Sequence, residues 1–188
     1  MTDDEAVIAP MRAWVEKVVV GLNFCPFATG VLRNNSLRYA VSHARNTEGV
    51  LQDLIAECRH LDEHPETETT LLLLPRGFTD FDTFLDLVAL ADDLLAMQGY
   101  EGIYQLAHFH PRYRFADSKP DDAADYTNRA PVPALHILRE ASLEKAVESH
   151  PDPEGIPERN VRLARDKGIA FMQALLEECR KTKSGNES

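Results

Sequence analysis

The short run Thr69 to Leu74 (TTLLLL) limits most strongly how this chain can fold. It has no polar residue after its threonines, and Pro75 follows it directly. A strand without polar alternate positions has no face to turn toward water, so it must lie in a sheet that is covered on both sides. Proline lacks the backbone donor that a sheet requires, and the strand therefore ends there. We expect Leu71 to Leu74 to lie in the central strand of an α/β domain.

Helix and strand patterns alternate around this run. Leu37 to His43 alternates like a half-buried strand, and apolar residues spaced by three and four then indicate a helix through Val50 to Leu61. A second helix, Phe81 to Leu95, precedes a strand that begins near Gly102. This order is typical of a parallel sheet with right-handed crossovers. The predicted fold is a single α/β domain with a short, mainly parallel sheet of about three main strands, covered by helices.

Helices are also expected at both ends of the chain. Apolar residues recur at helical spacing from Val7 to Leu22. Pro133 and Pro157 suit first helical positions, so we expect one helix from Pro133 through Ala146 and a last helix from Pro157 to Cys179. The domain is predicted to span residues 1–183, and residues 184–188 are predicted to be a disordered tail.

Charge and composition exclude several classes of protein. The net charge is −11, from 20 basic and 31 acidic residues, which disfavours binding to nucleic acid or to anionic membranes. No apolar run is long enough to span a membrane, and the acidic N-terminus MTDDEAVIAP does not resemble a signal or transit peptide. The 3 cysteines are scattered, so no disulfide framework is expected. A cytoplasmic protein is predicted, and its oligomeric state stays open.

The stretch from Tyr104 to Glu140 contains three of the 7 histidines. His108 and His110 share one strand face at the carboxyl end of a predicted strand, where open α/β sheets bind ligands. We interpret both as catalytic candidates, acting as general bases near neutral pH or as ligands of a divalent metal ion. Cys25, His136 or an aspartate of the following loop would complete such a metal site. The alternative is that the histidine pair is structural.

Cys25 is a third catalytic candidate. It lies in the apolar turn Phe24 to Ala28 (FCPFA), directly before a proline. A thiol with a lowered pKa would act as a nucleophile or a metal ligand, whereas burial in apolar surroundings raises the pKa and leaves the thiol inert. Both interpretations stay open.

Polar residues of the same stretch, together with the segment IPERN, suggest a site for a small anionic molecule. Arginine forks match carboxylates and phosphates, and free N–H groups at helix starts favour anions. The alternative is that these side chains form salt bridges with the loop's aspartates and only hold the loop in place. The candidate substrate-binding residues are Tyr113, Asn128, Arg129, His136, Arg139 and Asn160.

Several segments together resemble a known family. They are LNFCPFA at 22–28, ETTLLLLP at 68–75, FHPRYRF at 109–115, DYTNRAPVPALHILRE at 125–140 and IPERN at 156–160. These motifs are similar to those of a bacterial and plant family of domains of unknown function, number 1415. The resemblance covers nearly the whole chain, and it implies no particular activity.

Two functional hypotheses follow from the sequence. The first is a cytoplasmic enzyme, a hydrolase or transferase, that acts on a small anionic substrate with His108 and His110 as bases or metal ligands. The second is a non-catalytic binding or regulatory module in which the polar loop is structural. A metal analysis of the purified protein would separate them, because stoichiometric metal favours the first.

Overall fold

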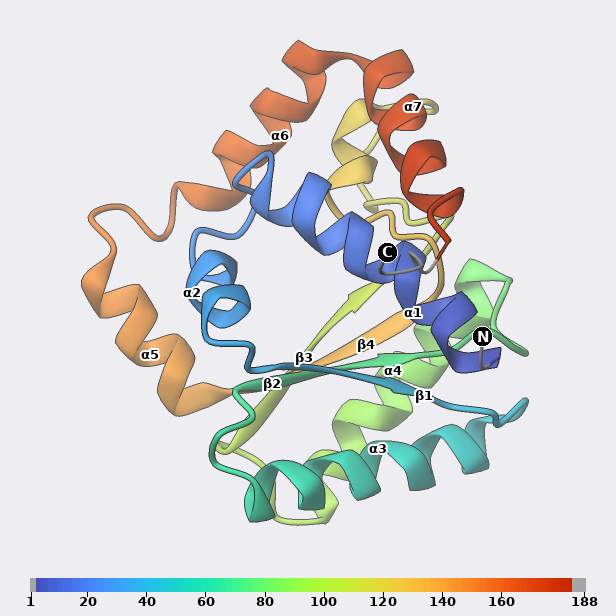
Figure 1. The fold of residues 1–188 in the computed structure, drawn as a ribbon, viewed down its shortest axis with the longest axis vertical. Coiled ribbons are helices and arrows are strands. Elements are labelled where there is room, and N and C mark those ends of the chain that lie inside the picture. Colours follow the sequence, from blue (N-terminus) through green and yellow to red (C-terminus); the bar gives the residue numbers. More distant parts are fainter. Residues whose placement is uncertain (1–2, 184–188) are drawn as a thin grey trace, which may run out of the picture.

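A computed structural model describes residues 3–183 of this chain, so the predicted tail at 184–188 lies outside the described residues. The described chain forms a single α/β domain around a four-stranded sheet of order β1-β2-β4-β3 (Figure 1). β1 and β2 are parallel, whereas β4 runs antiparallel to both of its neighbours. The strands are β1 (Leu37–Val41), β2 (Thr69–Leu73), β3 (Tyr104–Phe109) and β4 (Ala134–Arg139).

Helices cover both faces of the sheet (Figure 1). α3 and α4 lie on one face, and α1, the π-helix η1, α2 and α7 lie on the other. The helices are α1 (Asp3–Trp14), η1 (Val15–Val20), α2 (Ala28–Arg33), α3 (Thr47–Glu63), α4 (Phe81–Met97), the 3-10 helix η2 (Ala123–Thr127), α5 (Glu140–Ser149), α6 (Ile156–Lys167) and α7 (Ile169–Arg180). No helix in this part of the chain has the length and apolar character that a membrane crossing requires.

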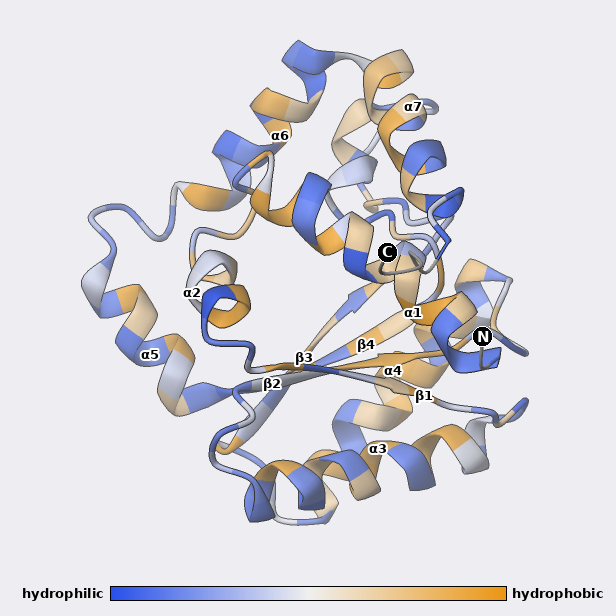
Figure 2. Cartoon of the chain, viewed as in Figure 1, coloured by the Kyte–Doolittle hydropathy of each residue, from blue (hydrophilic) through white to orange (hydrophobic). Residues whose placement is uncertain are grey.

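The expected position of the central strand is confirmed. Every residue of β2 is buried, and the strand lies between β1 and β4. Leu72 packs into the core under α3 and α4, while Leu71 and Leu73 pack into the core under α1 and α7. Figure 2 shows apolar colour along part of β2 and on parts of the helices beside the sheet, with hydrophilic stretches between them. The leucines at successive positions of β2 are therefore explained by burial of both faces of the strand.

The prediction of a mainly parallel sheet was wrong, as was the helix from Pro133. The residues after Pro133 form β4, which inserts between β2 and β3 and makes the sheet mixed, with one parallel pair. Ala134, Leu135 and Ile137 are fully buried, because a strand with neighbours on both sides and helices on both faces needs apolar residues throughout. The helix begins only at Glu140.

The terminal helices form where the apolar spacing predicts them, with one interruption in each. The N-terminal helix continues from α1 into the π-helix η1. The C-terminal helix is divided into α6 and α7 at Gly168, whose φ of 84° breaks the helical path. A glycine reaches this left-handed region without the steric cost that other residues incur.

Candidate functional site

The predicted histidine pair, His108 and His110, lies on one face of the sheet, whereas Cys25 and His136, which were proposed to complete a metal site with it, lie on the other. The His108 ring contacts Phe84 of α4 and stacks on Tyr113 at 5.5 Å between ring centroids. The His110 ring also contacts Phe84, at 5.1 Å. His136 and Cys25 line a cavity on the other face, beside Leu71 and the α1 side of the core. The expected convergence was therefore wrong, because neighbouring strand positions alternate between the two faces.

His110 has the environment of a structural residue. Its side chain is 0% exposed, and Nε2 donates to the Phe78 carbonyl at 3.0 Å. Nδ1 accepts a hydrogen bond from the Arg112 backbone N–H at 3.0 Å. Burial lowers the pKa of the imidazole, which favours the neutral form that these two bonds require. Neither ring nitrogen is free for a metal ion or for proton transfer.

His108 differs in that its Nδ1 is buried without a hydrogen-bond partner. Burial lowers the pKa of His108, and the Asp92 carboxylate partly opposes this effect. Within residues 3–183, no three His, Cys, Asp or Glu side chains are arranged to hold a metal ion. A metal site at His108 and His110 would require His110 to give up the hydrogen bond at the ring nitrogen that binds the ion.

The guanidinium of Arg129, in the loop, binds other groups of the same protein. Its Nε donates to the Tyr113 carbonyl at 2.9 Å, and its Nη2 lies 3.5 Å from the carboxylate of Asp125, which is 1% exposed. The guanidinium also stacks over the Tyr126 ring at 4.6 Å. The neighbouring Asn128 donates to the His108 carbonyl. These contacts match the alternative in which polar side chains hold the loop in place.

Arg139 and Asn160 likewise donate to backbone carbonyls. The Arg139 guanidinium binds the carbonyls of Leu61, His64 and Thr67, and thereby fastens the end of α3 to β4. Asn160 on α6 donates to the Phe24 carbonyl at 2.6 Å. The side chains of Asn128, Arg129, Arg139 and Asn160 are thus engaged in hydrogen bonds to backbone carbonyls of the protein itself.

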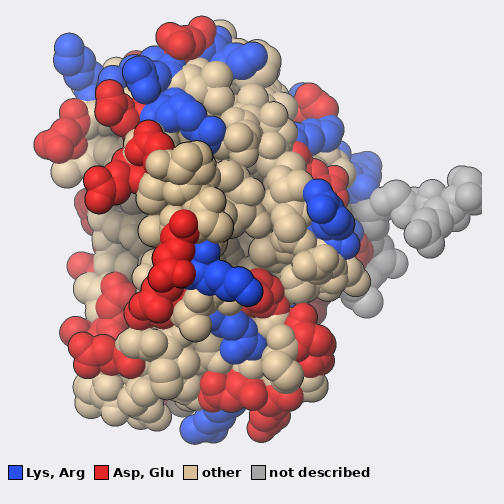
Figure 3. Space-filling model, turned by 90° about the vertical axis from the view of Figure 1, so that its left-hand side faces the viewer, with Lys and Arg blue, Asp and Glu red and all other residues tan. Residues whose placement is uncertain are grey.

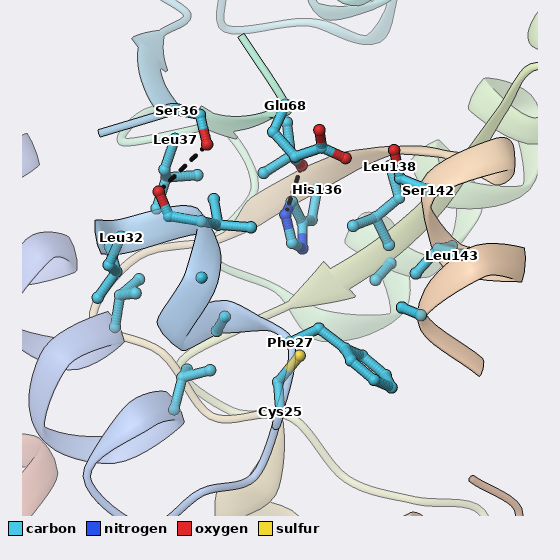
Figure 4. Close-up of a pocket in the computed structure, with 18 of the residues that line it drawn as sticks. Cys25, Phe27, Leu32, Ser36, Leu37, Glu68, His136, Leu138, Ser142 and Leu143 are labelled. Carbon is cyan, nitrogen blue, oxygen red and sulfur yellow. Dashed lines mark hydrogen bonds between the residues drawn. The ribbon is translucent and has the colours of Figure 1, made fainter. Parts of the chain in front are cut away.

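A cavity of about 790 Å³ lies between η1, the segment 25–37, the sheet and α5, a size typical of small-molecule sites. Its lining is mainly apolar and includes Trp14, Leu71 and Phe109. Cys25 and His136 point into it from opposite sides (Figure 4). Figure 3 shows the molecular face that carries α2 and α5, where an uncharged region has basic and acidic side chains along its edge.

His136 is oriented by a hydrogen-bonded chain that determines its tautomer. Its Nε2 lies 2.8 Å from the Thr69 hydroxyl, and this hydroxyl donates to the Ile137 carbonyl at 2.6 Å. A hydroxyl has only one proton to give, so Thr69 must accept from Nε2–H, and Nδ1 keeps its lone pair. Figure 4 shows the second ring nitrogen directed into the cavity. Burial lowers the pKa of His136 to about 4, and the ring is neutral at pH 7.

Cys25 lies in a turn that two other elements hold. Asn23 has a φ of 52°, a left-handed conformation, and the Phe24 N–H donates to the Val19 carbonyl of η1 at 2.8 Å. From α6, Arg159 and Asn160 donate to the carbonyls of Asn23 and Phe24. π-helical turns such as η1 occur frequently at functional sites. The thiol is free and partly exposed, in contrast to the buried thiols elsewhere in the chain.

Several polar residues of the cavity were not identified from the sequence. Thr69 orients His136, and Glu68, Ser142 and Lys145 are part of the lining. Thr69 faces His136 only because β2 pairs with β4, so predicting β4 as a strand would have been the necessary first step. Ser142 and Lys145 carry no local motif, and only the position of α5 brings them to the cavity.

The fold and the cavity define a single-domain α/β protein with a mainly apolar cavity on one face of its sheet. Residues 6–174 match the family model described as "Protein of unknown function (DUF1415)", and the chain belongs to this family. A comparison with curated proteins found no match, and a comparison with solved structures found none either. The matched range includes every residue that lines the cavity.

Proposed function

We propose that this protein is an enzyme that binds a small, mainly apolar molecule in the cavity, with Cys25 as nucleophile and His136 as proton acceptor. The reaction class is acyl transfer, either to water or to a second acceptor. The observation that carries this proposal is the unprotonated Nδ1 of His136, which faces the cavity that also receives the Cys25 thiol.

The proposed step follows the usual logic of an activated nucleophile, in which a third group orients the base. The Cys25 thiol gives its proton to Nδ1 of His136 while Sγ forms a bond to the carbonyl carbon of the substrate. The resulting imidazolium returns the proton to the leaving group as the bond between carbon and leaving group breaks. Water or a second acceptor then attacks the acyl carbon and gives its proton to Nδ1, and this proton returns to Sγ as the C–Sγ bond breaks. Thr69 takes the orienting role, because it fixes Nε2 and leaves Nδ1 free.

The low pKa of His136 defines when the ring can accept a proton. An isolated imidazolium is unfavourable in an apolar cavity, so the ring does not take the thiol proton before the substrate arrives. The negative charge that develops on the electrophile, whether on an attacked carbonyl or on a departing halide, compensates the imidazolium charge. Proton transfer is therefore expected to accompany attack of Sγ on the electrophile.

A second candidate function is non-catalytic binding of the same kind of molecule. The apolar lining and the weakly basic, neutral His136 favour it, because a general base works best with a pKa near the working pH. In this case Nδ1 only accepts a hydrogen bond from a donor group of the ligand.

Alkylation of the native protein by iodoacetamide, followed by intact mass measurement, separates the two functions. Cys58 and Cys179 are buried and burial raises the pKa of both thiols, so they serve as internal controls. We expect a single adduct, absent in Cys25→Ser, that forms at least about ten times more slowly in His136→Gln. Equal rates in the wild type and His136→Gln would remove His136 as a base and leave the binding function.

A further inference from the structure

The inner surface of α5 differs in chemistry from the rest of the cavity. Ser142, Lys145 and Ser149 all line the cavity, although most of the remaining lining is apolar. A helix that only packs on a core turns an apolar stripe toward it. α5 lines the cavity with Leu143 and Ala146 and buries none of its residues, and the exposed Lys145 and Ser149 place polar groups where the cavity meets the surface.

The polar groups on α5 keep free hydrogen-bonding capacity. Ser149 donates to the Ala146 carbonyl, but within residues 3–183 neither the Ser142 hydroxyl nor the Lys145 ammonium has a hydrogen bond or an ion pair. Arg139 also lines the cavity, yet its guanidinium is directed to backbone carbonyls. Lys145 is therefore the cation of the lining that remains available to a ligand. The Glu68 carboxylate also lines the cavity, and the tests below take its charge into account.

We infer that the ligand of this cavity is an anionic amphiphile, with an apolar chain beside Leu71 and Phe109 and a carboxylate or phosphate group bound by Lys145 and Ser142. This inference rests on the proposed use of the cavity as the binding site and adds the substrate class. It places the anion at α5 and not at Arg129, where the sequence suggested it. A lysine pairs with either anion as a point charge, and the serine hydroxyl adds a donor.

Four chain-matched probes test the head group: octanoate, octyl phosphate, octanol and octylamine. Calorimetry gives each dissociation constant, and protection of Cys25 from iodoacetamide shows that the probe occupies the cavity. We expect octanoate or octyl phosphate to bind the wild type at least about ten times more tightly than octanol, and the stronger of the two identifies the anion. Lys145→Gln should abolish this preference and leave octanol binding unchanged, whereas Lys145→Arg should keep it.

Lys181→Gln, at an exposed lysine after α7, is the matched control and should behave as the wild type. The inference is overturned if octanol or octylamine binds best, if Lys145→Gln retains the preference for anions, or if no probe protects Cys25. Stronger binding of octylamine would indicate that the cavity binds a cationic head group through the Glu68 carboxylate. The alkylation rates of wild type and His136→Gln without any probe test the catalytic pair separately, so the two proposals fail on different measurements.

Discussion

Replacing Arg129 with alanine tests whether this residue holds the loop or serves a ligand. Asp125 is 1% exposed and has the Phe115 N–H at 3.1 Å and the Arg129 guanidinium at 3.5 Å as partners. Arg129→Ala leaves the carboxylate with the backbone donor alone. Removing one partner of a buried pair costs roughly 3–5 kcal/mol. The Arg129 side chain is 21% exposed and the contact is long, so we expect the lower end, about 3 kcal/mol.

Urea denaturation followed by circular dichroism measures this loss, and a thermal melt should show a decrease of roughly 6–12 °C for a chain of this size. Asp125→Asn in the Arg129→Ala background should restore part of the stability, because a neutral amide does not need the cation. Arg180→Ala is the control, since the Arg180 and Glu177 pair is exposed and its loss should cost less than about 1 kcal/mol. An Arg129→Ala protein with the wild-type urea midpoint would refute the structural role.

Three further predictions concern the cavity. Thr69→Val removes the acceptor of His136 Nε2–H, so Cys25 alkylation should slow several-fold with a stability loss of about 1–2 kcal/mol, and an unchanged rate would contradict the orienting role. The folded-state pKa of His136, about 4, lies below the ordinary histidine pKa of 6.5, so stability should fall as pH decreases from 6.5 to about 4. At pH 4.5 the loss of stability caused by His136 is at most about 2.5 kcal/mol. Urea denaturation of His136→Gln and of the wild type across this pH range should show a smaller decrease in unfolding free energy for the variant. Asn160→Ala frees the Phe24 carbonyl, and hydrogen exchange of the turn around Cys25 should accelerate; equal exchange would show that this bond does not hold the turn.

The sequence predicted those parts of the fold that depend on local patterns. α3, α4 and β2 form at the predicted places, because their apolar periodicity is regular and their ends carry caps or proline. β4 was missed because its identity depends on pairing with β2 and β3, which lie far away in the chain. Pro133 is compatible with both a helix start and a strand start, so local evidence favoured the wrong element.

Of the residues that the sequence proposed for a site, Cys25 and His136 line one cavity, but His108 and His110 do not lie there with them. His108 shares a strand with the cavity residue Phe109, yet successive residues of β3 point to opposite faces, which places His108 toward α4. Arg129 of the loop does make ordered polar contacts, as its sequence context suggested. Its partners are the Tyr113 carbonyl and Asp125 of the protein itself. Lys145 had no distinguishing neighbours in the sequence, because only the path of α5 brings it to the cavity.

The segments that identify the family lie far apart in the chain, yet all of them reach the cavity or hold its walls. Segments 22–28, 68–75, 109–115 and 125–140 each contribute lining residues, and segment 156–160 binds the carbonyls of the turn that carries Cys25. The core under α3 and α4 contains many other buried residues that lie outside these segments. A core accepts exchanges among apolar residues of similar volume, whereas a thiol, an imidazole and the groups that orient them have no apolar substitute. On the proposed function, the polar cavity residues of these segments would therefore tolerate substitution less well than the apolar residues of the core.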